Sequence, residues 1–230
     1  MREQSSNPKC VSLLKRIQVF LSSICALFIL ILFYEGPVFA LSPTPQFRLS
    51  PLALSLKFVE FTDDRGDPIV DRLSLQAILH VLNRIYSPCQ LVFLLGRYEV
   101  VKPERVGLTA APQSLTEMRR FRQPFMDARH LVIIHTAGWD HQRVGPANAW
   151  TAMPGDFPLG AVIEGKVARF AGIIAHELGH YLSLYHVKDD FNLMNPVIYA
   201  KSNQLSEAQC HDVRRAALSY HSHALRKGLL

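Results

Sequence analysis

The sequence has no internal repeat, no low-complexity stretch and no basic stripe with interleaved aromatic residues. The last absence argues against nucleic acid as a partner, so the formal net charge of +6 is attributed to a solvated surface. Hydrophobic residues make up 49% of the chain, which is ordinary for a globular protein and excludes general disorder. The part after residue 40 is long enough for one domain with a real core, and too short to favour two.

Long apolar runs are also scarce, and the single clear one lies near the N-terminus. Ile17 to Tyr34 is almost entirely apolar and follows a basic leader. Val38-Phe39-Ala40 then resembles a signal-peptidase site. Two interpretations stay open for residues 1–40: a signal peptide cleaved after Ala40, or a membrane anchor formed by residues 17–34. Both place the rest of the chain outside the cytoplasm, as a secreted, periplasmic or membrane-anchored protein.

Residues 41–54 contain three prolines and no cysteine, and are interpreted as a linker or short pro-segment. A single folded domain is then assigned to residues 55–230. Cysteine is rare there: Cys89 and Cys210 are its only two. In an oxidising compartment an even pair favours a disulfide, and the alternative is two buried free thiols.

Hydrophobic periodicity predicts a mixture of strands and helices in this domain. Asp71 is a candidate N-cap for one helix, and Ser114 with Glu117 a candidate capping box for another. The predicted strands cover residues 55–62, 90–101, 131–135, 147–152 and 159–163, and the predicted helices cover residues 71–86, 113–121, 167–184 and 206–220. This order indicates an α+β class with an α/β-like N-terminal part: a mixed sheet packed on two long helices, plus a C-terminal helix.

The predicted helix over residues 167–184 contains the motif His176-Glu177-Leu178-Gly179-His180. Histidines four residues apart stand on one helix face, one turn apart, and can bind the same zinc ion. Glu177 is a candidate general base, because a carboxylate beside the metal can take a proton from water and pass it to the leaving amine. The motif therefore predicts a zinc-dependent peptidase.

Two further features extend the motif. His186 follows His180 by six residues, and Met194-Asn195-Pro196 follows at a short distance. Together these segments resemble the zinc signature H-E-x-x-H-x-x-G-x-x-H and the Met-turn of the metzincin metallopeptidases, and are most similar to the matrixin branch or its bacterial relatives. The resemblance implies a single metzincin-like domain, Zn²⁺ bound by three histidines (His176, His180 and His186), catalysis by Glu177, and a peptide or protein substrate.

The resemblance also implies where a peptide would bind. It would pair with an edge strand near Ala147–Ala152, which includes Trp150, and the pocket beyond the cleaved bond would be walled by residues 197–199. Pro196 stands where some metzincins have a tyrosine ligand, so three histidines and a water are expected. Tyr199 is a candidate for lining the pocket.

The signature departs from the family pattern at Ser183, which stands in the place of the usual glycine. Glycine tolerates a positive φ, and serine would adopt it at a cost of about 1 kcal/mol or more. The other histidines of the domain are expected to be structural or solvent-exposed: His130, His135, His141, His211, His221 and His223.

Three functions remain to be compared. The first is an exported zinc endopeptidase, and the second is a non-catalytic zinc-binding protein that uses a metzincin-like fold for binding or assembly. Intact Glu177 argues against the second, because a binding module needs no general base. The third is a membrane-anchored protease, which differs from the first in the role of residues 17–34.

Overall fold

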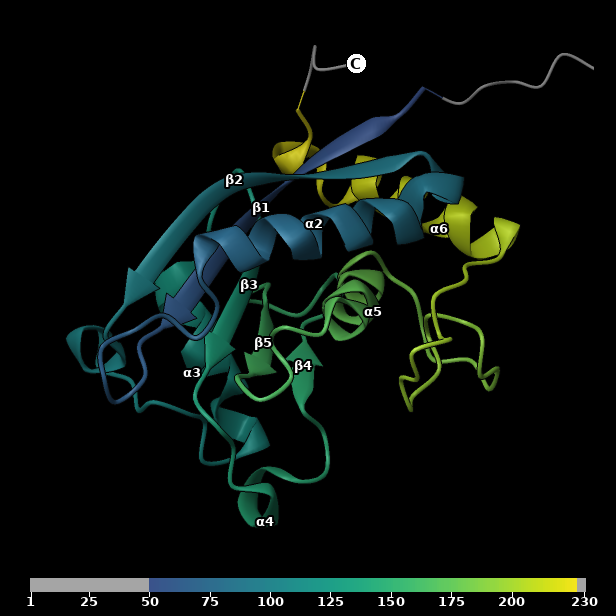
Figure 1. The fold of residues 1–230 in the computed structure, drawn as a ribbon. Helices are drawn as coiled ribbons and strands as arrows, with labels where there is room; N and C mark the ends of the chain where they lie inside the picture. The colour runs from purple at the N-terminus through teal and green to yellow at the C-terminus, as the bar shows by residue number, and fades with distance from the viewer. Residues whose placement is uncertain (1–49, 227–230) are drawn as a thin grey trace, which may run out of the picture. The chain divides into compact units, whose positions relative to one another are not determined.

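The computed structural model describes residues 50–226 (Figure 1). The predictions for residues 1–40, and for most of the 41–54 segment, lie outside the described residues. Within the described part, no helix has the length and apolar character needed to cross a membrane.

The centre of the domain is a five-stranded sheet with the order β2-β1-β3-β5-β4. Its strands are β1 (Leu52–Phe61), β2 (Leu91–Val101), β3 (Leu131–Thr136), β4 (Ala149–Thr151) and β5 (Ala161–Glu164). Neighbouring strands are parallel except for β4, which runs antiparallel to β5 and forms one edge. β1 begins three residues before the predicted strand, so residues 52–54 belong to the sheet and not to a linker.

The side chains of β1, an inner strand, are buried on both faces of the sheet. Leu54, Leu56 and Phe58 point into a core that contains residues of the three long helices. Val59 and Phe61 point into a second core that lies against shorter helical segments. Burial on both faces explains why β3 is a nearly continuous apolar run.

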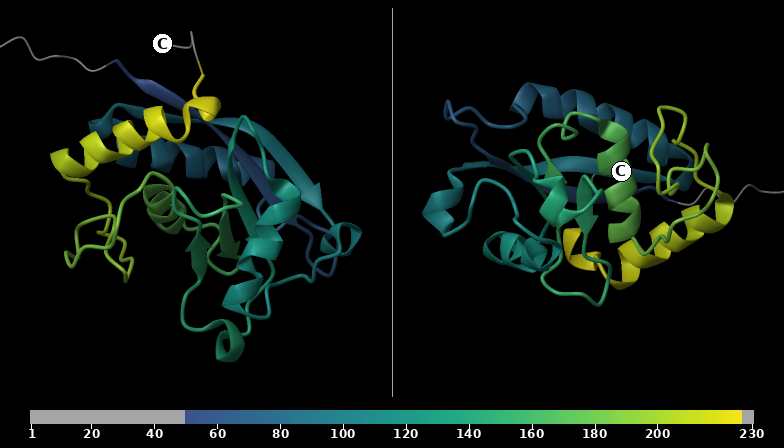
Figure 2. Two further views of the ribbon diagram at one scale, coloured as in Figure 1. Left: turned by 180° about the vertical axis from the view of Figure 1, so that it is seen from behind. Right: turned by 90° about the horizontal axis from the view of Figure 1, so that it is seen from below.

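The helices are α2 (Arg72–Tyr86), α3 (Met118–Arg122), α4 (His141–Val144), α5 (Ala171–Tyr181) and α6 (Glu207–Ser219). α2 lies across one face of the sheet, with α5 beside it (Figures 1 and 2). Asp71 caps α2 as predicted, by accepting a hydrogen bond of 2.9 Å from the backbone N–H of Ser74. The α+β class expected from the sequence is therefore observed, including the C-terminal helix.

Two helix predictions need correction. The helix predicted over residues 167–184 is shorter, because residues 165–170 form consecutive turns and α5 begins only at Ala171. The predicted capping box at Ser114 is wrong, because its hydroxyl pairs with the hydroxyl of Thr116 at 2.8 Å. Glu117 instead accepts from the backbone N–H of Gln113, and a 3₁₀ turn precedes α3.

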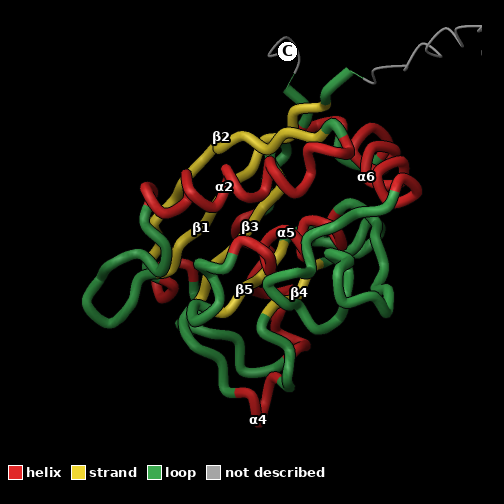
Figure 3. Tube along the Cα trace, turned by 45° about the vertical axis from the view of Figure 1, so that its right-hand side comes forward, coloured by secondary structure: helices red, strands yellow, loops and turns green. Residues whose placement is uncertain are grey.

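Cys89 and Cys210 form a disulfide, which decides between the two interpretations of this pair. Cys89 ends the 3₁₀ turn after α2, and Cys210 lies in the first turn of α6. The bond therefore joins the first long helix of the domain to the last, across 121 residues of sequence. Figure 3 shows α6 following the long loop that leaves α5.

Candidate metal centre

α5 brings the first two histidines together through its helical spacing. His176 and His180 stand one turn apart, with ring centroids 4.7 Å from each other. His176 is buried, whereas His180 is half-buried. The two rings therefore reach from the helix toward one point.

A tight turn at the end of α5 brings in the third histidine. The N–H of Leu184 donates to the carbonyl of Gly179 and the N–H of Ser183 donates to that of His180, both at 2.9 Å. This pair of bonds is a Schellman motif, in which the residue after the C-cap adopts a left-handed conformation. Ser183 occupies that position with φ of +71°, as the family resemblance predicted. The chain then reverses, and His186 faces the helix.

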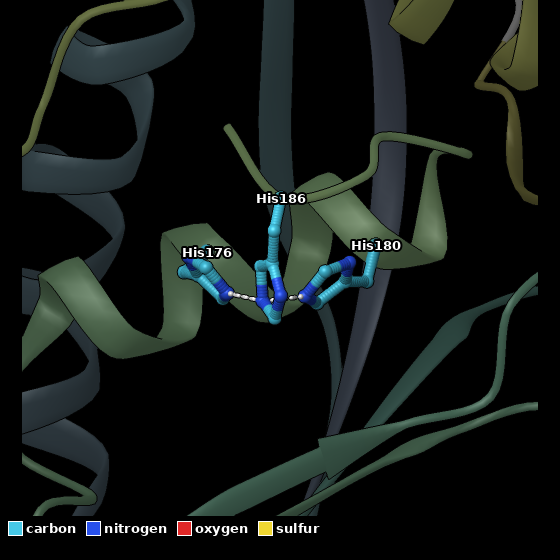
Figure 4. Close-up of side chains that lie close together, drawn as sticks. All are labelled: His176, His180 and His186. Carbon is cyan, nitrogen blue, oxygen red and sulfur yellow. Dashed lines mark hydrogen bonds between the residues drawn. The ribbon is translucent and has the colours of Figure 1, made fainter. Parts of the chain in front are cut away.

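The three imidazoles converge through their Nε2 atoms (Figure 4). The Nε2 atom of His186 lies 3.2 Å from that of His176 and 3.1 Å from that of His180. A search of the described histidine, cysteine, aspartate and glutamate side chains for potential metal ligands finds this cluster of three histidines. Their ligand atoms all lie within 4.8 Å of one another, close enough to share one metal ion.

Backbone carbonyls fix which nitrogen of each helix histidine carries its proton. The Nδ1–H of His176 donates to Leu193 at 2.7 Å, and that of His180 donates to Leu184 at 2.8 Å. Their Nε2 atoms therefore present lone pairs to each other and to His186. A cluster of lone pairs is unfavourable without a cation between them, and carbonyl-bound imidazoles are the usual form of metal-ligating histidines.

Electrostatics keep the helix histidines neutral. Burial lowers the pKa of His176 to about 4, and the neighbouring imidazoles contribute in the same direction. The pKa of His180 is likewise lowered, chiefly by burial. Neutral imidazole is the form that binds a metal, so the residues fit a transition-metal ion with nitrogen ligands.

Glu177 lies beside the histidines and is almost fully buried. Burial raises the pKa of its carboxyl to about 7, against the opposing effect of a hydrogen bond from Thr151. That bond joins the Oγ1 atom of Thr151, in the edge strand β4, to Glu177 Oε2 at 2.5 Å. Thr151 was not singled out from the sequence, because nothing local to β4 shows which residue of α5 it will meet.

Met194, in the segment that resembles a Met-turn, packs beneath the motif. Its side chain is fully buried, and a Cβ atom at Gly179 would collide with its sulfur. Glycine within the His-Glu-Leu-Gly-His motif is therefore needed for close approach of the methionine.

The Met-turn is anchored to α6 by a pair of amides. Asn192 donates to Gln209 at 2.8 Å and accepts from it at 3.1 Å. Asn192 also accepts from the N–H of Met194 at 2.9 Å. Neither amide stands out in the sequence, because the two residues are separated by 17 positions.

The histidines and Glu177 line a cleft of about 700 Å³. Residues 146–151 form one wall and residues 196–198 form the other. Trp150 is 41% exposed, in the expected edge strand. Tyr199, in contrast, lines a neighbouring pocket with Phe170, so only part of the predicted 197–199 wall faces the cleft.

The remaining histidines with described partners serve other contacts, as expected. His130 and His135 each pair with a carboxylate at 2.8 Å, from Asp127 and Glu60 respectively. His221 contacts the carbonyl of Tyr181 at 2.8 Å.

Comparison with known proteins shows that the fold is similar to those of metalloproteinases. No family model matches the sequence, and no curated protein matches it closely. Mature mirolysin from Tannerella forsythia, solved with a cleaved peptide, superposes with a TM-score of 0.56 and 12% identity over 77% of this chain and 99% of that one. Metalloproteinase-II from Bacteroides fragilis superposes with a TM-score of 0.50 and 12% identity over 74% of this chain.

The chain spans about half of the Bacteroides structure, at 55% of its length. At such identities the likeness concerns the fold. The predicted α+β domain with a mixed sheet and a C-terminal helix is confirmed, and its fold is similar to those of these metalloproteinases.

Proposed function

We propose that this protein is an exported zinc-dependent endopeptidase. The observation that carries the proposal is the convergence of three imidazole Nε2 atoms next to a buried carboxylate, in a cleft bordered by a free strand edge. His176, His180 and His186 are the proposed zinc ligands, since three neutral histidines leave a fourth position open for water or substrate. The sequence Met194-Asn195-Pro196 favours a relationship to the matrixin branch.

When bound, zinc supplies Lewis-acid chemistry at the scissile carbonyl and acidifies water. Glu177 is the proposed general base: it takes the proton of the attacking water and delivers it to the leaving amine. Thr151 donates to one carboxylate oxygen of Glu177 and leaves the other free to take the proton. Its bond also fixes the carboxylate relative to the edge strand on which the substrate would lie.

A peptide or protein is the proposed substrate. Among the strands of residues 50–226, β4 pairs with β5 alone, so its other edge offers backbone donors and acceptors with which an extended peptide can pair. The cleaved peptide bound to mirolysin supports this choice of ligand. The disulfide between Cys89 and Cys210 supports export, because such bonds persist in oxidising compartments.

Replacing Glu177 by glutamine provides the test. The variant is expected to retain one zinc ion per chain and to lose cleavage of a peptide library by at least about 100-fold, because the general base is gone. A chelator should abolish cleavage by the native protein, and added zinc should restore it. If the native protein binds zinc and cleaves nothing, the non-catalytic binding function is supported instead. If Glu177→Gln cleaves at the native rate, Glu177 is not the general base.

A further inference from the structure

Glu164 is a buried carboxylate close to the cleft that the proposed reaction does not use. It ends β5, and its side chain is 2% exposed. Burial alone would raise its pKa, but hydrogen bonds led by that from Asn148 hold the pKa below the ordinary value. The group is therefore a carboxylate with several donors directed at it.

These donors come from both ends of the segment that joins β3 to β4. At the start, the N–H of Trp139 donates to Glu164 Oε1 at 3.1 Å. At the end, Asn148 Nδ2 donates to Oε2 at 2.6 Å, and the Asn148 carbonyl accepts from the N–H of Glu164 at 2.8 Å. One side chain thus closes residues 139–148 into a loop.

The side chains of Lys166 and His141 complete the cluster. Lys166 Nζ lies 3.2 Å from Glu164 Oε2, and His141 Nε2 lies 3.0 Å from it. His141 also contacts the carbonyl of Gly145 through Nδ1 at 2.8 Å, which ties the middle of the loop to the same carboxylate. The loop is therefore held at its two ends and near its tip.

The last residues of this loop border the proposed active site. Pro146, Ala147 and Asn148 line the cleft and lead directly into β4. Thr151, at the other end of β4, contacts Glu177, so the cleaved bond lies nearer to that end. A peptide antiparallel to β4 would then place its residues after the cleaved bond beside residues 146–148.

We propose that Glu164 is a positioning residue, which holds residues 146–148 in place to bind the part of the substrate that follows the cleaved bond. This role rests on the proposed peptidase function. In this role, Glu164 and its partners contribute to the binding of extended peptides and not to the chemical step.

The test compares Glu164→Gln with the native protein on two peptides. One peptide has four residues after the cleaved bond, and the other has the same sequence cut to one residue there. For the longer peptide, KM is expected to rise about tenfold in the variant while kcat falls much less. For the shorter peptide, KM should change less than about twofold, because that peptide does not reach residues 146–148.

Glu60→Gln is the matched control. Glu60 is also a buried carboxylate, bonded to His135 at 2.8 Å and to the N–H of Val70 at 3.0 Å, but it contacts no residue that lines the cleft. Glu60→Gln therefore tests how the loss of a buried charge affects the protein in general. Its ratio of KM values for the two peptides should equal that of the native protein. Equal KM changes for both peptides in Glu164→Gln, or the same selective change in Glu60→Gln, would overturn the proposal.

A second variant covers the case in which Glu164→Gln does not fold. Lys166 is 55% exposed, so Lys166→Met should fold while removing one partner of the carboxylate. The expected result is a smaller rise in KM, about two- to threefold, again confined to the longer peptide. An unchanged KM would count against the cluster. If zinc is bound but neither the native protein nor any variant cleaves either peptide, the proposed peptidase function fails. If cleavage occurs but the KM change is not confined to the longer peptide, only the role of Glu164 fails.

Discussion

Replacing Ser183 by glycine is expected to stabilise the protein. Ser183 has φ of +71°, and a side chain in the left-handed region costs about 1–2 kcal/mol. Glycine removes that cost but adds about 0.5–1 kcal/mol of chain entropy to the unfolded state. The net gain is therefore about 0.5–1 kcal/mol, which for a domain of this size raises Tm by about 1–4 °C.

The measurement is thermal and urea unfolding of chelator-treated protein, so that metal binding adds nothing to the stability. Ser183→Ala is the first control, because alanine keeps the Cβ atom and should stay within about 0.5 kcal/mol of the native protein. Gln90→Gly is the second: Gln90 has φ of +54° far from the metal centre in sequence, and should give a similar gain. A destabilised Ser183→Gly, or an equal gain in Ser183→Ala, would show that the positive φ is not the source of the cost.

Three further changes test the packing and the buried groups. Replacing Cys89 and Cys210 by alanine should lower the free energy of unfolding by about 2–4 kcal/mol, since the bond closes a long loop; an unchanged urea midpoint would contradict this. Gly179→Ala should cost about 1–3 kcal/mol and weaken zinc binding, because the added methyl collides with Met194; calorimetric metal titration measures the second effect. Burial lowers the pKa of His221 to about 4, below its unfolded value of about 6.5, so protonation of the unfolded chain should reduce stability as pH falls from about 6.5 to 4. His221→Phe should flatten that part of the stability profile, and an unaltered slope would refute the assignment.

The convergence of the three histidines could be predicted because it depends on residues that are close in sequence. Helical spacing alone places His176 beside His180, and the position of Ser183 in the signature predicted the backbone conformation that the turn adopts. The third histidine follows from that turn. These features depend on neighbours within about ten residues, where sequence pattern and geometry agree.

The rest of the site depends on contacts between distant segments. Thr151 meets Glu177 only because β4 has a particular register at the sheet edge, and Glu164 meets Trp139 only after the intervening loop has closed. The pairing of the two cysteines has the same character. Periodicity predicted the strands themselves, but it contains no information about which side chains their ends bring together.

The amide pair between Asn192 and Gln209 connects the surroundings of the disulfide to the Met-turn. Gln209 lies next to Cys210 in the first turn of α6, and Asn192 holds the turn whose Leu193 carbonyl fixes the proton of His176. A continuous chain of bonded groups therefore runs from the sulfur bridge to the first proposed ligand. The disulfide that fixes the first turn of α6 is thus joined, through two side-chain amides, to the turn that orients the His176 imidazole.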